Sequence, residues 1–72
     1  MSKFTDLLKH KRKEKGLTQK ETAKEFGWTS MYYGRFENGH LIPTKLNLRL
    51  FATFLEIDIK ELQKILDEKQ DN

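Results

Sequence analysis

The chain has 72 residues, 14 of them Lys or Arg and 11 Asp or Glu, with a formal net charge of +3 and no cysteine. A chain of this length makes one domain that buries only about 60% of its unfolded surface, so its fold must depend on local contacts such as those of short helices. The lack of cysteine excludes disulfides and thiolate zinc sites, and with no apolar run near about 20 residues and no signal-peptide core we expect a cytoplasmic protein that does not enter membranes.

The first predicted helix runs to about Lys15, where Gly16 ends it, and either Ser2 or Thr5 is expected to be its N-cap. Apolar groups recur along it at helical spacing and form one stripe: Phe4, Leu7, Leu8 and the stem of Lys11. This stripe is expected to pack on the rest of the domain and to leave the lysine-rich opposite face in solvent.

A second helix is predicted at residues 19–26. Thr18 and Glu21 are three residues apart and form a capping box, in which each side chain accepts from the other's backbone N–H. Gly27 ends the helix at the position where a left-handed residue is needed. Ala23 faces inward and is small, which allows the next helix to cross close by.

A third helix is predicted at residues 30–37, with only three residues between it and the second one. Thr29 offers the N-cap hydroxyl, and Trp28 with Tyr33 occupies the two positions of a hydrophobic staple. Tyr33 and Phe36 are one turn apart and are predicted to be buried. Two short helices joined by a tight turn are therefore the centre of this sequence.

These residues resemble the helix-turn-helix of the Cro and phage-repressor-like regulators, aligned without a gap from about Phe4 to Leu66. The shared features are Gly16-Leu17-Thr18-Gln19, Ala23, Gly27, and Glu37-Asn38-Gly39 followed by Pro43. The resemblance implies an all-α, compact five-helix, lambda-repressor-like DNA-binding domain at residues 1–66, with a frayed acidic tail at 67–72. Thr22 and Trp28 depart from the family pattern, which usually has Leu and a small aliphatic residue there.

Four side chains of the third helix are the candidates for reading DNA bases. Because Tyr33 and Phe36 take the buried face, the opposite face displays Ser30, Met31, Tyr32 and Arg35. In helix-turn-helix proteins this helix enters the major groove, where an arginine can fork onto guanine and a methionine can pack on a thymine methyl. The arginine can also hold a phosphate, and exposed Met and Tyr residues also occur without any function.

Gly34 lies in the middle of the same helix, where glycine costs about 1 kcal/mol relative to alanine. We therefore expect that its missing side chain lets a neighbour approach closely. The two neighbours considered are the DNA backbone and Arg35.

Phosphate contacts are expected from four residues: Gln19, Asn38, His40 and Lys45. Gln19 opens the second helix, where backbone N–H groups and the helix dipole favour an anion, and the resemblance implies the same role. The loop after Gly39 offers further N–H groups, and the resemblance assigns backbone contacts to this loop. For Gln19 the alternative is an ordinary polar surface residue.

Four further residues are expected to support the helix pair: the N-caps Thr18 and Thr29, and the pair Arg12 and Glu37. The resemblance implies that Arg12 binds Glu37, which would tie the first helix to the third. A planar guanidinium suits such a partly buried carboxylate. The alternative for Arg12 is a phosphate contact or a free surface charge.

The fourth predicted helix, residues 45–55, carries two apolar stripes, which is more than a surface helix of a monomer needs. The first belongs to the core: Leu48, Phe51, Ala52 and Leu55. The second is a candidate dimer interface: Leu46, Leu50 and Phe54. Either a fifth helix, capped by Asp58, covers the second stripe, or a second copy of the chain does. A dimer would place two recognition helices about 34 Å apart on one face of a DNA duplex.

Charge is distributed unevenly along the chain. Residues 1–49 carry eleven basic and five acidic residues, a net +6, whereas residues 50–72 carry three and six, a net −3. This asymmetry favours a polyanion on the side of the helix pair, although the same charges could serve only solubility. His10 and His40 have no acidic or thiol companion, so we expect neither a metal nor a cofactor, and no catalysis.

The sequence therefore predicts a sequence-specific, double-stranded DNA-binding transcriptional regulator, a small repressor that binds a palindromic operator as a homodimer. The alternative is an antitoxin or other protein-binding module that holds a protein partner with its C-terminal half and regulates its own transcription. Controller proteins of restriction–modification systems have similar length and are not separated by these arguments. RNA is less favoured than DNA, because a helix fits poorly into the deep, narrow major groove of A-form RNA.

Overall fold

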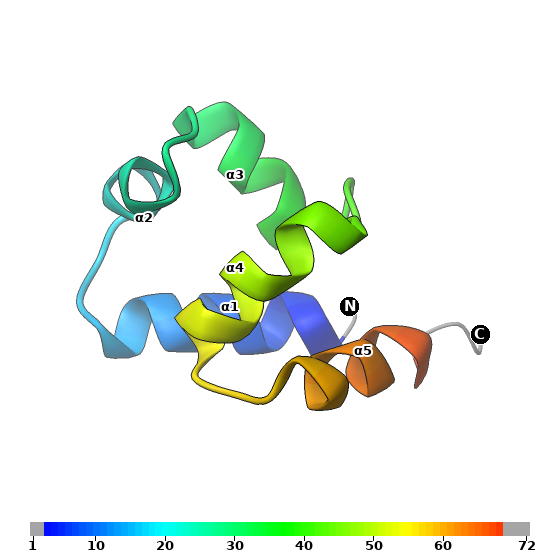
Figure 1. Cartoon of the computed structure of the whole chain (residues 1–72). Coiled ribbons are helices and arrows are strands. Elements are labelled where there is room, and N and C mark those ends of the chain that lie inside the picture. Colours follow the sequence, from blue (N-terminus) through cyan, green and yellow to red (C-terminus); the bar gives the residue numbers. More distant parts are fainter. Residues whose placement is uncertain (1–2, 69–72) are drawn as a thin grey trace.

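Five α-helices make up the part of the chain that the computed structural model describes, residues 3–68 (Figure 1). They are α1 (Lys3–Glu14), α2 (Gln19–Phe26), α3 (Ser30–Glu37), α4 (Lys45–Leu55) and α5 (Ile59–Glu68). The predicted all-α fold is confirmed, and residues 3–68 contain no strand. Of the tail expected at 67–72, the first two residues end α5 and the others lie outside the described residues.

The helix ends follow from local chemistry. Thr18 Oγ1 accepts from the N–H of Glu21 at 3.0 Å, and the Glu21 carboxylate accepts from the N–H of Thr18 at 2.9 Å, so the capping box is present. Gly27 takes the left-handed conformation that ends α2, with φ 81°. The expectation that Thr5 caps α1 is wrong, because Thr5 lies inside the helix and is buried. The other candidate cap, Ser2, lies outside the described residues.

Phe51 of α4 is at the centre of an aromatic core. Its ring is fully buried, and its centroid lies 5.3 Å from that of Phe4, 5.2 Å from Phe26, 5.7 Å from Trp28 and 5.0 Å from Phe36. These rings come from α1, α2, the α2–α3 turn and α3, so one side chain joins four segments. Edge-on and tilted ring pairs of this kind add to the free energy gained by burial.

Trp28 fills the turn between α2 and α3. It stacks on Phe26 of α2 at 4.8 Å and on Phe36 of α3 at 5.4 Å, and it meets Tyr32 edge-on at 4.8 Å. The staple was predicted between Trp28 and Tyr33, but the α3 rings that Trp28 stacks on or meets edge-on are Tyr32 and Phe36. A large aromatic residue at this position therefore fixes α3 through two of its turns.

The second stripe of α4 is shorter than predicted. Leu46 is 88% exposed and Leu50 is 43% exposed, whereas Phe54 is only 8% exposed. Phe54 is covered in part by α2, with the ring of Phe26 at 5.4 Å, which is a neighbour that the sequence did not predict for this stripe. The fifth helix packs on α1 and α4 through Leu62 and leaves the two leucines uncovered. None of the helices within residues 3–68 has the length and apolar character that a membrane span requires.

Candidate nucleic-acid interface

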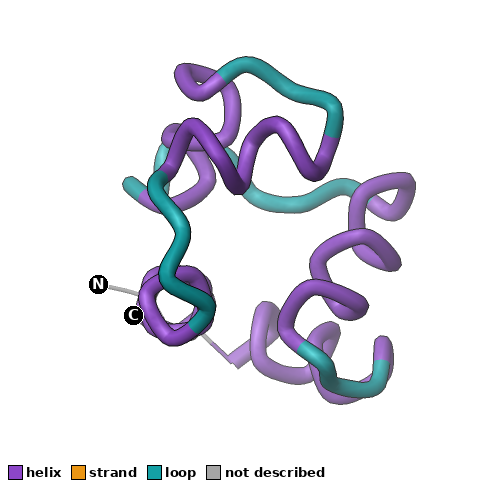
Figure 2. The backbone as a smooth tube through the Cα atoms, turned by 90° about the vertical axis from the view of Figure 1, so that its left-hand side faces the viewer, coloured by secondary structure: helices purple, strands orange, loops and turns teal. Residues whose placement is uncertain are grey.

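The helix pair α2–α3 lies at one side of the domain and packs on α1 and α4. The segment after α1 leads the chain up to α2, and α3 follows it on the same side, away from α5 (Figures 1 and 2). Thr29 caps α3 by accepting from the N–H of Tyr32 at 3.1 Å. Two capped helices, the left-handed Gly27 and the stacked Trp28 therefore hold the pair in one geometry.

One face of α3 is open to solvent. Tyr33 and Phe36 are buried, as the spacing predicts, and Met31 is 71% exposed. Ser30, Tyr32 and Arg35 are also exposed, so the four candidate base-reading residues share the outer face. The Tyr32 ring lies edge-on to both Trp28 and Phe36, which restricts where its hydroxyl can reach.

Behind this face, the Glu37 carboxylate is the centre of a buried polar cluster. It is 1% exposed and accepts from Arg12 Nε at 2.6 Å and Arg12 Nη2 at 3.3 Å. Tyr33 Oη donates to it at 2.6 Å, and Gln19 Nε2 donates at 3.0 Å. Arg12 Nη1 also donates to the carbonyl of Leu17 at 2.9 Å. The Arg12–Glu37 pair expected from the resemblance is present and joins α1 to α3. With Gln19, the cluster also includes α2.

Contacts within this cluster shift the pKa values of Glu37 and Tyr33. Burial raises the pKa of Glu37, but the hydrogen bonds from Arg12, Tyr33 and Gln19 outweigh it and hold the pKa of that carboxyl below its usual range. The pKa of Tyr33 is raised, first by burial and then by its hydrogen bond to Glu37. Because folding lowers the pKa of Glu37, its ionised carboxylate stabilises the folded state above pH about 4.3, the pKa in the unfolded chain. This stabilisation is lost as the pH falls through the pKa that Glu37 has in the folded state.

The side chain of Gln19 makes a contact that the sequence did not predict. Its amide donates to Glu37, so it positions α2 on α3. The backbone N–H groups of Gln19 and Lys20 still belong to the first turn of α2, where no intrahelical acceptor exists. An anion contact by these N–H groups and by the second N–H of the Gln19 amide stays a prediction. The bond to Glu37 escaped the sequence argument because it joins residues 18 positions apart.

The loop after α3 also differs from the expectation. The N–H groups of Asn38, Gly39 and His40 all donate to carbonyls of α3, at 2.9, 3.3 and 2.8 Å, and Gly39 has φ 82°. They close the helix and are not available to a phosphate, so that part of the prediction is wrong. The side chains of Asn38, His40 and Lys45 are exposed, and in these three residues only the side chains remain as predicted phosphate contacts.

Gly34 faces the Gln19 side chain of α2, and the close approach of the DNA backbone or of Arg35 stays a prediction. A Cβ at this position would meet the Gln19 Oε1 atom at 3.5 Å, an ordinary contact distance. We therefore expect Gly34→Ala to raise the free energy of unfolding by about 0.4–1 kcal/mol, because alanine restricts the unfolded chain and favours the helix. Urea unfolding would measure the change, and a loss of stability would show that α2 and α3 need the glycine for closer packing.

Metal binding finds no support in the described residues. Within residues 3–68 there is no group of three or more His, Asp or Glu side chains placed to hold a metal ion. The exposed polar groups of α3 and the following loop instead offer donors to a large anionic ligand.

Comparison with known proteins gives a consistent result. A family model described as helix-turn-helix matches residues 8–62. The chain is 38% identical over 61 residues to the "ImmF control region 10 kDa protein" of Bacillus phage phi105, a match that covers 85% of this chain and 68% of that protein. It is 38% identical over 60 residues to the "Cryptic phage CTXphi transcriptional repressor RstR" of Vibrio cholerae serotype O1, covering 83% of this chain and 54% of that protein. No solved structure gives a significant match.

Proposed function

The chain belongs to the helix-turn-helix family, in the group of Cro and phage-repressor-like DNA-binding regulators, and we propose that it represses transcription as a homodimer on an approximately palindromic operator. The observation that carries the proposal is the exposed outer face of α3, which no other element within residues 3–68 covers and which the capped turn holds in place. The repressor named among its relatives supports the direction of regulation.

In this proposal the outer face of α3 reads sequence. Arg35 forks onto a guanine, Met31 packs on a thymine methyl, and Ser30 and Tyr32 offer hydroxyls to a base or a phosphate. The position of the domain on the duplex comes from phosphate contacts by Lys45, by the Asn38 and His40 side chains, and by the N–H groups of the first turn of α2. These contacts hold the protein without distinguishing one sequence from another.

Two substitutions separate these roles. We expect Arg35→Ala to relax specificity at one position of each half-site, worth about 1–3 kcal/mol of discrimination. We expect Lys45→Ala to weaken binding to all duplexes alike and to lower the salt slope by about 1. Fluorescence anisotropy on duplexes selected from a random pool and on bulk genomic fragments, at several salt concentrations, would measure both effects.

The matched control is Lys64→Ala, which removes an exposed lysine on α5, away from the helix pair. It should leave both affinity and selectivity unchanged. The assignment of roles would be contradicted if Arg35→Ala and Lys45→Ala lost the same affinity on selected and bulk DNA. The proposal as a whole fails if the unaltered chain shows no preference for any selected duplex.

A protein-binding role is the second candidate, favoured by the exposed Leu46 and Leu50. In that case the chain is an antitoxin-like module that holds a protein partner and regulates its own transcription. A different protein that co-purifies in stoichiometric amount from the native source would support this role over the homodimer.

A further inference from the structure

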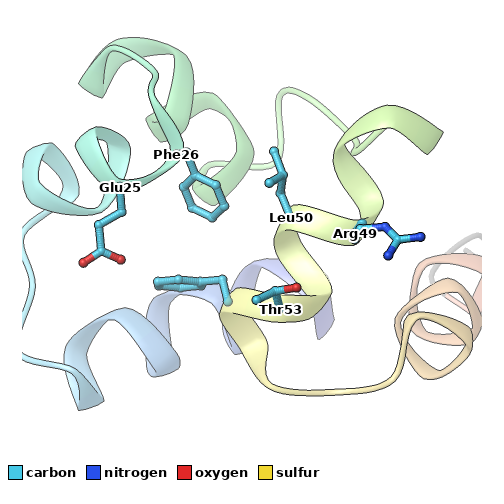
Figure 3. A pocket seen from close by; sticks show the side chains of 6 residues that line it. Glu25, Phe26, Arg49, Leu50 and Thr53 are labelled. Carbon is cyan, nitrogen blue, oxygen red and sulfur yellow. The ribbon is translucent and has the colours of Figure 1, made fainter.

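A hollow of 260 Å³ lies between the end of α2 and one face of α4 (Figure 3). Its lining is mainly apolar, with charged residues as well: Glu25, Phe26, Arg49, Leu50, Thr53 and Phe54. Leu50 is 43% exposed beside it, and Leu46, one turn earlier on α4, is 88% exposed. Exposed apolar side chains one turn apart beside an apolar hollow are typical of a contact with another protein.

The two charges of this hollow have opposite signs and lie at opposite ends. Glu25 comes from α2 and Arg49 from α4, and their charged groups point away from each other with the apolar side chains between them (Figure 3). Neither forms an ion pair with any residue in the range 3–68. Of the residues that line the hollow, a carboxylate therefore lies at one end and a guanidinium at the other, while the Lys15 ammonium over the Phe54 ring is paired with Glu56.

We infer that this hollow, which we call the α2–α4 surface, binds a second copy of the chain about a two-fold axis. In a dimer with a two-fold axis, each contact between a residue of one subunit and a residue of the other occurs twice. Glu25 then meets Arg49 of the partner subunit, Arg49 meets the partner's Glu25, and the Leu46 and Leu50 regions face each other. A partner with charges of one sign would be attracted at one end and repelled at the other, so the pattern fits the chain itself.

This inference rests on the proposed dimer and identifies the surface that forms it. The stripe predicted on α4 contributes Leu50 and Phe54 to the hollow, and α2 adds Glu25 and Phe26. The proposed interface therefore includes both helices. The four candidate base-reading residues, Ser30, Met31, Tyr32 and Arg35, do not line the hollow, so a second copy bound there does not have to use them.

Charge reversal tests the pairing directly by sedimentation velocity over a range of concentrations. Glu25→Lys alone and Arg49→Glu alone each place like charges opposite each other twice in a homodimer. Each should weaken dimerisation about tenfold or more, which corresponds to about 1.4 kcal/mol. In an equimolar mixture of the two variants, the mixed dimer has both contacts attractive again, so dimerisation should return to within about threefold of the unaltered chain.

Two further variants complete the experiment. Glu61→Lys changes an exposed charge on α5 and should leave dimerisation unchanged, whereas Leu50→Asp should dissociate the dimer. Circular dichroism confirms that each variant is folded. The inference is overturned if the single reversals dimerise like the unaltered chain, if the mixture stays monomeric, or if the unaltered chain is monomeric both free and on DNA. A chain that dimerises through this surface but shows no preference for selected duplexes would contradict the proposed function and leave the inference standing.

Discussion

Replacement of Arg12 by methionine is expected to lower the free energy of unfolding by about 3–5 kcal/mol, because it leaves the buried Glu37 carboxylate without its counter-ion. A domain of 72 residues has a total stability of about 4–11 kcal/mol, at about 0.05–0.15 kcal/mol per residue. The variant should therefore lose a large part of its stability, and all of it if the total lies at the lower end of this range. Urea unfolding followed by circular dichroism measures the change.

The matched control is Arg35→Met, which removes an exposed arginine and should change stability by less than about 0.5 kcal/mol in the absence of DNA. A second comparison uses the double variant Arg12→Met with Glu37→Met. Because it leaves no unpaired charge in the interior, it should be more stable than Arg12→Met alone. If Arg12→Met unfolds at the same urea concentration as Arg35→Met, the buried pair does not contribute as described.

The features that the sequence predicted correctly depend on residues close together in the chain. The capping box joins Thr18 and Glu21, the cap of α3 joins Thr29 and Tyr32, and Gly27 needs only its own left-handed backbone. Each is decided within one helical turn, so spacing alone was enough to predict the helices and the turn between them.

The contacts that the sequence did not predict are those between tertiary neighbours. Phe54 was expected to lie under a fifth helix or a second copy of the chain, and its contact with Phe26 of α2 was not predicted. Gln19 was predicted to contact a phosphate, and its bond to the Glu37 carboxylate was not predicted. Helical periodicity says which face a residue occupies, and it does not say which element packs on that face. The resemblance supplied the Arg12–Glu37 pair, which no local pattern predicts.

The bond between Tyr33 and Glu37 is a different case, since a signal for it was present. The two residues are four positions apart on α3 and therefore lie on the same face. Tyr33 was predicted to be buried and Glu37 to be partly buried, and a buried phenol needs an acceptor. Combining these statements would have predicted the bond from the sequence.

Phe51→Ala is expected to destabilise the domain by about 3–5 kcal/mol, the usual cost of removing a buried ring. The reason is specific to this core, because the ring contacts Phe4, Phe26, Trp28 and Phe36 and thereby joins α1, α2, the turn and α3 to α4. Without it the helix pair loses its support, so binding to selected duplexes should fall along with the folded fraction. Thermal unfolding and fluorescence anisotropy on one sample measure both effects.

Leu46→Ala is the control for Phe51→Ala, since it also shortens an apolar side chain of α4 but at a position that is 88% exposed. Measured below the concentration at which the chain self-associates, it should cost less than about 0.5 kcal/mol. Phe51→Leu, which keeps most of the buried volume, should fall between the two. The central place given to Phe51 would be wrong if its alanine variant kept the thermal midpoint of Leu46→Ala. A variant that stayed fully folded but lost DNA binding would show that the ring acts on the position of α3 more than on stability.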